Sequence, residues 1–284
     1  MKEKSILKGG AELILFAAFV LVLCMPKTVS KASYDALCFC AKSVIPPLFV
    51  STVLAKAAAK SFIFKKLPLT AEIFIIATLC GCPAGAIAVK ELYSGGEIDE
   101  KAAGYLLSFS AGASLPFLVG YVGAGLFGDI CVGLKLAAFQ TTAKALIAVI
   151  FKKIIFKKEK IPKASGKSRR GLSEEIRSGA EAMITVCASV VFFVAVANAF
   201  SSLLGLRGFL RDLICAMAEF SSGCKTLCGY EHGFLLTAFT VGHGGFSAAA
   251  QIIGVTRGEI DLKYFFVGKA FECFIITALS FLFG

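Results

Sequence analysis

Long apolar runs separated by short polar turns make up most of this chain. Several of the runs approach the roughly 20 residues that an α-helix needs to cross a bilayer. The predicted helical segments cover residues 11–25, 34–59, 69–92, 102–122, 130–151, 179–204, 209–220, 232–253 and 262–283. The pattern therefore predicts an all-α, polytopic membrane protein, in which the segment 209–220 is too short to span unaided.

The composition agrees with a membrane protein. Hydrophobic residues form 57% of the 284 residues, and the mean hydropathy is +0.80. Charged residues form 17%, below the roughly 25% of soluble domains. A soluble core of this size would need more polar cover, so we expect a single integral membrane unit.

One basic segment divides the chain. Residues 152–177 carry ten Lys or Arg residues against three Glu, which is +7 of the chain's net charge of +11. Short basic loops stay on the cytoplasmic side, so we expect a cytoplasmic linker that also binds anionic lipid headgroups. The segment has no interleaved aromatic residues, so we do not expect a nucleic-acid partner. The predicted parts are an N-terminal span or signal-anchor (1–31), a first membrane repeat (32–151), this linker and a second membrane repeat (178–284).

The N-terminal segment has two interpretations. Three lysines precede the apolar run 11–25, and Ser30-Lys31-Ala32 has small residues like those of a cleavage site. The segment is therefore either a cleaved signal peptide or, as we favour, a retained first span. In both cases its basic flank faces the cytoplasm.

The number of segments conflicts with a cytoplasmic linker. Five full crossings from a cytoplasmic N-terminus would put the linker outside. At least one segment of the first half must therefore be re-entrant or broken, and the candidates contain Pro46-Pro47, Gly81 to Gly85, or Gly112 to Pro116. Such breaks survive in a membrane only where protein or a water-filled cavity surrounds them.

A short sequence occurs twice. Gly96-Glu97-Ile98-Asp99 returns as Gly258-Glu259-Ile260-Asp261, and Lys101 and Phe109 match Lys263 and Phe271 at the same offset. Each copy follows an apolar segment that small residues interrupt, at 81–86 and at 242–247. We therefore expect two pseudo-symmetric repeats, each with a broken helix. Such pairs of broken helices are a sequence indicator of a solute site near the bilayer midplane.

The two breaks are the predicted binding site. A helix that restarts after a break directs free N–H groups and its positive dipole end into the gap, which favours an anion. The residues concerned are Gly81, Pro83 and Gly85 in the first copy and Gly242, Gly244, Gly245 and Ser247 in the second. The alternative is that these small residues only let helices pack closely.

Ionisable residues within spans are further candidates, because burying them is costly. Lys90 follows the first break by two turns, and Gln251 follows the second by about one turn. Lys144 lies deep in the segment 130–151, whereas Lys269 and Glu272, three residues apart, are expected to pair with each other. His243 lies between glycines in the second break, where it could bind a solute or, with Cys80 and Cys82, a transition metal.

The remaining cysteines lie mostly in apolar runs, where we expect them to act as small hydrophobes. The chain has no serine elbow, no His-Glu-x-x-His and no paired-carboxylate motif, so we predict no enzyme, no catalytic residue and no cofactor.

Several of these motifs together resemble one family. Gly81-Cys-Pro-Ala-Gly-Ala86, Gly96-Glu-Ile98, Phe109-Ser110 and Ser114-Leu-Pro-Phe-Leu-Val-Gly120 through Gly128 are similar to sporulation integral membrane proteins of the YlbJ type. That family belongs to the wider group with nucleoside-recognition or Gate domains. The likeness covers residues 32–284 and is strongest over 80–128. The chain differs from the usual pattern at Ile87, where a lysine is common, and at Ala111, where an asparagine is expected.

The resemblance implies a multi-pass protein of the bacterial inner membrane with two Gate-type repeats. Members of the family are linked to moving dipicolinate across the outer forespore membrane, so Ser110 and Ser114 join the candidate substrate-binding residues. The prediction is a permease for a small, anionic organic solute, with solute and membrane lipid as partners. A metal-ion or nucleoside permease and a non-transporting scaffold in spore-envelope assembly remain alternatives. The sequence does not predict the oligomeric state.

Overall fold

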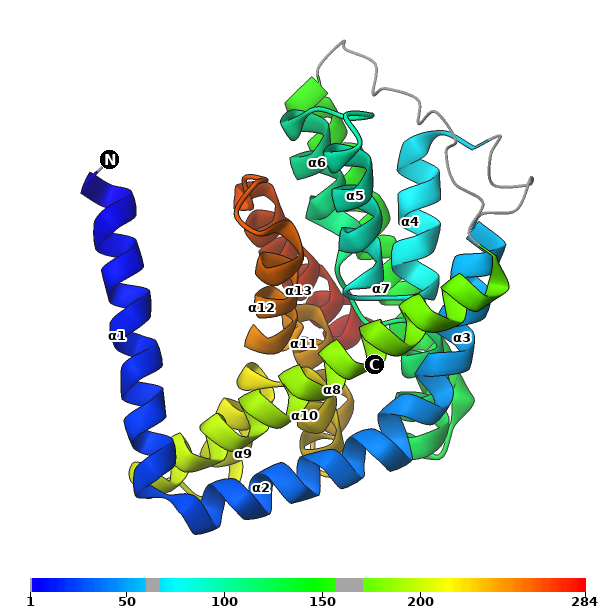
Figure 1. Cartoon of the computed structure of the whole chain (residues 1–284). Helices are drawn as coiled ribbons and strands as arrows, with labels where there is room; N and C mark the ends of the chain where they lie inside the picture. Colours follow the sequence, from blue (N-terminus) through cyan, green and yellow to red (C-terminus); the bar gives the residue numbers. More distant parts are fainter. Residues whose placement is uncertain (1, 60–66, 157–170) are drawn as a thin grey trace.

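The structure is a computed structural model that describes residues 2–59, 67–156 and 171–284. Helix accounts for 85% of it, and the described residues contain no strand. The prediction of an all-helical protein is therefore confirmed (Figure 1). Residues 157–170, which form most of the predicted basic linker, lie outside the described residues.

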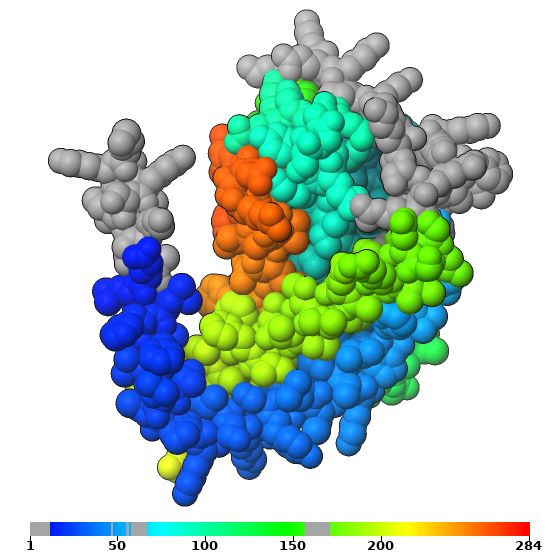
Figure 2. Space-filling view, viewed as in Figure 1, coloured from blue at the N-terminus to red at the C-terminus, as the bar shows by residue number. Residues whose placement is uncertain are grey.

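The chain begins with a bent pair of helices. Helix α1 (Lys2–Cys24) meets α2 (Pro26–Phe39) at a bend of 100°, and Pro26 begins α2, where its missing N–H breaks no helical hydrogen bond. A π-helical turn, η1 (Cys40–Val44), then leads into α3 (Ile45–Ala59), so the Pro46-Pro47 pair lies in the first turn of a helix. Helix α1 contacts α2 and α8, and an open space separates it from α12 in Figure 2.

Breaks interrupt two predicted segments of the first half. The segment 69–92 forms α4 (Leu69–Leu79) and α5 (Ala84–Ser94), and the segment 102–122 forms α6 (Glu100–Ser110) and the π-helix η3 (Phe117–Phe127). We name these interruptions break A (residues 80–83) and break B (residues 111–116). Helix α7 (Ile130–Phe156) then runs without interruption.

The second half follows a related plan. After α8 (Leu172–Leu203), the short predicted segment 209–220 becomes α9 (Gly208–Ala218), which meets α10 (Phe220–Leu227) at Glu219. Helices α11 (Gly233–His243) and α12 (Gly245–Thr256) meet at Gly244, and α13 (Lys263–Phe283) ends the chain. We name Glu219 break C and Gly244 break D.

Among the residues that the structure describes, three helices are long and apolar enough to cross a membrane: α7, α8 and α13, with a fourth span if the bent N-terminal pair is counted as one. This count is below the nine predicted segments because the breaks divide several of them into helices that are too short. Large apolar side chains on the outer surface, such as Ile184 and Phe274, are about 70% exposed. These features indicate a membrane-embedded protein.

The repeated tetrapeptide forms the same turn in both halves. Gly96 and Gly258 have φ angles of 70° and 72°, which a glycine adopts without steric cost just after a helix. The aspartates at the ends of the two tetrapeptides then accept backbone hydrogen bonds, Asp99 from Ala102 N at 2.7 Å and Asp261 from Lys263 N at 2.9 Å. Both segments therefore have the order helix, break, helix, turn, helix, and their assignment as Gate-type repeats stays a prediction.

Two apolar clusters hold the helices together. One contains Tyr105, Phe109 and Phe151 and includes Ala111 at the start of break B. The other contains Phe117 and Val241, among others, and includes Ala113. Gly112 lies between these two alanines, so break B passes from one apolar cluster to the other at the point where the polar residues described below gather.

Candidate substrate site

The four breaks pack against each other in two pairs. In the first pair, Cys82 N of break A donates to Gly112 O of break B at 2.8 Å, and a Cβ on Gly81 would lie 2.7 Å from Ser114 N. In the second pair, Gly245 follows break D, and a Cβ there would lie 2.9 Å from Phe220 N beside break C. Each broken helix therefore rests on the break of another helix of its own half.

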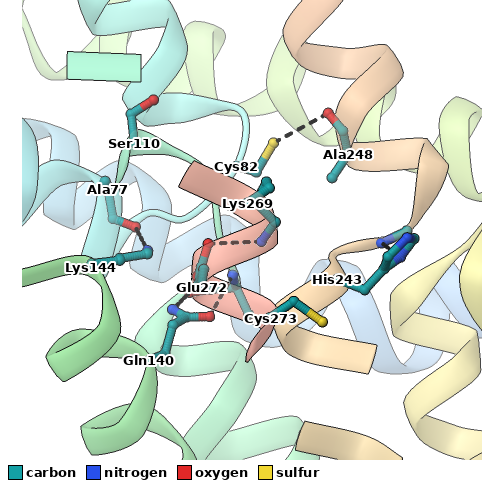
Figure 3. A network of polar contacts seen from close by, with 12 residues as sticks. Ala77, Cys82, Ser110, Gln140, Lys144, His243, Ala248, Lys269, Glu272 and Cys273 are labelled. Carbon is teal, nitrogen blue, oxygen red and sulfur yellow. Dashed lines mark hydrogen bonds and ion pairs between the residues drawn. The ribbon is translucent and has the colours of Figure 1, made fainter. Parts of the chain in front are cut away.

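Cys82 connects the two halves. Its thiol lies 3.9 Å from the carbonyl oxygen of Ala248 and 3.8 Å from Oε1 of Gln251, both on α12. Break A of the first half therefore contacts the restarting helix of the second half. The side chains that gather around this junction are shown in Figure 3.

Helix α7 supplies two buried polar side chains to the first pair of breaks. Gln140 donates to Ala113 O at 2.7 Å and accepts from Ala113 N at 3.1 Å. One turn further, the ammonium of Lys144 donates to Ala77 O at 3.2 Å. Ala77 lies in the last turn of α4, where the negative end of the helix dipole favours a cation.

A second lysine occupies the corresponding place beside break D. The Nζ atom of Lys269 lies 3.1 Å from the position of a Cβ on Gly244, the residue that ends α11. Lys269 also forms an ion pair of 2.9 Å with Oε2 of Glu272, as the sequence predicted. In each half, a lysine therefore lies at the C-terminal end of the helix that precedes the break, α4 in the first half and α11 in the second.

Glu272 joins the two lysines into one group, which we call the charge triad (Lys144, Lys269 and Glu272; Figure 3). A Cβ on Gly112 would lie 2.7 Å from Nζ of Lys144 and 3.1 Å from Oε1 of Glu272, so both charged groups border this glycine. Among the described residues, Oε1 of Glu272 has no hydrogen-bond partner. The side chain thus uses one oxygen for Lys269 and leaves the other free near Lys144.

The charge triad carries an excess of positive charge. Lys144 and Glu272 are fully buried, and the side chain of Lys269 is 12% exposed. Three residues after Lys269 the chain has Glu272, whereas three residues after Lys144 it has Ile147. Two ammonium groups therefore face one carboxylate. Because an uncompensated buried charge is costly, the arrangement favours an additional anion.

A small cavity adjoins the triad at Cys82 and Gly112. It reaches from breaks A and B to break C and is closed laterally by side chains of η1, α3 and α8. Its lining residues are Val44, Leu48, Thr52, Cys80, Cys82, Gly112, Ala113, Ser114, Phe117, Met183, Val186, Val190, Glu219, Phe220, Ser221 and Gln251. The cavity is mostly apolar with a few polar groups, as small-molecule sites usually are.

Glu219 brings a carboxylate to the far wall of this cavity. It caps α10 by accepting hydrogen bonds from Ser221 N, Ser222 N and the Ser221 hydroxyl, at 2.7 to 3.0 Å. The N-terminus of α10 is therefore occupied by a side chain of the protein itself. Helix α5, which follows break A, begins at Pro83 without a side-chain cap.

Two of the predicted site residues line the cavity, namely Ser114 and Gln251. Three other predicted residues of the first half, Gly81, Gly85 and Ser110, lie in close contact with neighbouring groups. A side chain at Gly81 or Gly85 would collide with the backbone of Ser114 or Ser110, and the Ser110 hydroxyl donates to Leu107 O within its own helix. For these glycines, close packing is therefore the role that the geometry explains directly.

The predicted residues of the second break, Gly242 to Gly245 and Ser247, are not among the residues that line the cavity. Gly242 packs on the backbone of Cys273, with 2.7 Å from a Cβ position to its Cα. His243 accepts a hydrogen bond from Gly245 N through Nδ1 and stacks on Phe239. The hydroxyl of Ser247 is buried and has no partner among the described residues.

Lys90 lies away from these groups. Its ammonium pairs with Glu259 in the turn between α12 and α13, and it also lies 5.6 Å above the ring of Tyr93. This contact joins the ends of α5 and α12 rather than the breaks.

The metal-binding arrangement of Cys80, Cys82 and His243 is not found. Within the described ranges, no group of three or more His, Cys, Asp or Glu side chains is close enough to hold a metal ion. None of the eleven cysteines, all of which the structure describes, forms a disulfide, and Cys40, Cys80 and Cys224 are buried, as expected of small hydrophobic residues.

No family model, curated protein or solved structure matches the chain. The class of protein therefore follows from the fold and the site alone. They define a membrane-embedded helical protein with broken helices and buried charges at its centre.

Proposed function

We propose that the chain is an integral membrane permease for a small organic anion. The observation that carries this proposal is the charge triad, in which a buried lysine and a partly buried lysine lie near one buried carboxylate beside a cavity. An anion in the cavity would compensate the excess positive charge. The resemblance to sporulation membrane proteins of the YlbJ type suggests a dicarboxylate of dipicolinate size and a bacterial inner or outer forespore membrane.

The broken helices support a transport role. Interrupted backbone at membrane depth is tolerated where protein or water surrounds it, and in transporters it lines the solute site. Breaks A, B and C all contribute residues to the cavity, and break D is in contact with break C. Alternating access would move these paired elements relative to α3 and α8, which close the cavity from the side.

Uptake into proteoliposomes tests the proposal. We expect the purified protein to take up labelled pyridine-2,6-dicarboxylate, and to transport uridine and Fe²⁺ poorly. Lys144→Gln and Lys269→Gln should each reduce the initial rate on the order of tenfold, the effect of losing a charge-assisted hydrogen bond. Lys135→Gln is the matched control, because Lys135 is an exposed lysine of the same helix α7.

Equal uptake by the wild type and both lysine variants would contradict the assigned site. Uptake of uridine or Fe²⁺ alone would favour the nucleoside or metal permease. Absence of uptake for every solute would favour the non-transporting scaffold.

A further inference from the structure

Glu272 is a buried carboxylate in which only one of the two oxygen atoms has a hydrogen-bond partner. Its Oε2 atom is paired with Lys269 at 2.9 Å, whereas Oε1 has no partner among the described residues. A buried carboxylate oxygen without a hydrogen bond is costly, and ionisable groups of this kind in membrane proteins often carry protons.

The elements around Glu272 contribute the following ionisable groups. Helix α7 contributes Lys144, α11 contributes His243, which interacts with Lys269, and break A contributes Cys82, which interacts with all three residues of the triad. On α13 itself the neighbours are Lys269 and Cys273. From α6, Lys101 lies over the ring of Phe156 at the end of α7, and Tyr105 donates to Ala148 O, so both are engaged elsewhere.

From this geometry we propose that Glu272 is the proton-binding group of the permease and that anion transport is coupled to proton transport. The inference rests on the proposed function. Its carrying observation is the free Oε1 atom beside Lys144, at the glycine where both halves of the molecule meet.

The charges explain the coupling. With Glu272 ionised, the charge triad has a net charge of +1; with Glu272 protonated, it has +2 and matches a dicarboxylate. An anion that pairs with the lysines offsets the positive potential that stabilises ionised Glu272. Its binding therefore favours the protonated form of Glu272. Because linkage is reciprocal, the proton favours the anion equally. Solute and proton therefore bind together on one side and leave together on the other.

The neighbours of Glu272 select a proton over a metal cation. Two ammonium groups border the carboxylate, and they would repel a sodium ion. No second acidic side chain joins the triad in the described part of the chain, so the oxygen ligands that a metal ion needs are missing. A proton needs only the free oxygen.

The test uses the full chain in proteoliposomes with valinomycin and equal potassium on both sides, with pyridine-2,6-dicarboxylate as the probe. An alkaline interior should raise wild-type accumulation several-fold above the level without a gradient. A pH dye enclosed in the vesicles should report acidification when the probe is added. Glu272→Gln should lose the effect of the gradient on whatever uptake it retains, because no group then takes up the proton.

The control is Glu181→Gln, which removes an exposed carboxylate of α8 and should behave as the wild type. Wild-type exchange without any effect of the gradient would overturn the coupling and leave the permease in place. If the wild type neither exchanges nor takes up the probe, the permease fails and the coupling fails with it.

Glu272→Gln that still accumulates the probe along the gradient would remove Glu272 from the proton path. If Glu272→Gln does not fold, Glu272→Asp keeps a carboxylate at an altered distance from the lysines. A shifted pH profile of uptake then supports the assignment, and a profile equal to that of the wild type overturns it.

Discussion

Gln140 binds both backbone groups of Ala113. The side-chain amide donates to the carbonyl oxygen at 2.7 Å, and its oxygen accepts from the N–H at 3.1 Å. Ala113 lies in break B, where the backbone has left the helix and cannot satisfy these groups itself. Gln140 therefore substitutes for the missing helical hydrogen bonds and fixes break B to α7.

Replacing Gln140 by leucine should destabilise the protein. The N–H and C=O of Ala113 would be buried without partners, at a cost of about 1–3 kcal/mol for each group. Thermal unfolding in detergent should show a clear decrease in midpoint. Thr142→Val, at an exposed position of the same helix, should leave the midpoint nearly unchanged. An unchanged midpoint in both variants would contradict the role of Gln140.

Gly112→Ala should disturb the charge triad directly. The new methyl group would lie 2.7 Å from Nζ of Lys144 and 3.1 Å from Oε1 of Glu272, so at least one charged group must move. We expect a loss of about 1–3 kcal/mol in stability, which is typical of overpacking, together with slower anion uptake. Gly120→Ala is the matched control, since no atom lies within 4 Å of its Cβ position. Similar uptake by the two variants would argue against the triad as a transport site.

Glu219→Gln should affect stability and affinity in opposite directions. The carboxylate caps α10, and weakening the cap should cost about 0.5–2 kcal/mol. The same substitution removes a negative charge from the cavity wall, so the KM for an anion should fall roughly threefold or more. Unfolding curves and uptake kinetics measure the two effects. A raised KM for the anion would contradict the electrostatic role assigned to Glu219.

Asp261→Asn should have an effect that depends on pH. Hydrogen bonds from the backbone N–H and the ammonium of Lys263 hold the pKa of Asp261 below its ordinary value. The group therefore stabilises the fold above the unfolded-state pKa, near about 4, and this contribution disappears as the pH falls through the lowered folded-state pKa. The unfolding midpoints of the wild type and Asp261→Asn should differ at pH 7 and converge below about pH 4. A difference that stays constant over this range would contradict the assignment.

The positions of breaks A, B and D were predictable because glycine and proline mark them in the sequence. Break C was not predicted, since Glu219 is neither, and its signal is an acidic residue followed by two serines that it can cap. The Lys269–Glu272 pair was predicted from its helical spacing and is confirmed. These features depend on local sequence, which a pattern along the chain can report.

The joining of Lys144 and Glu272 at Gly112 was not predictable. The three residues are far apart in the chain, and their proximity depends on how α7 and α13 pack around break B. The same reason explains why the sequence alone could not show which of the predicted site residues pack tightly against a neighbouring backbone. A glycine beside a break can leave space for a ligand or allow a neighbouring backbone to pack closely. Only the tertiary contacts distinguish these two roles.

The two halves have similar arrangements of helices and breaks, but their charged residues differ. Lys269 has Glu272 three residues along its helix, whereas Lys144 has Ile147 at the same spacing. In the proposed cycle a single carboxylate takes up a single proton, so a dicarboxylate that crosses with it carries one net negative charge. Such transport is electrogenic, and a voltage of 100 mV changes its driving force by about 2.3 kcal/mol. The polarity of the membrane therefore helps to decide on which side the solute collects.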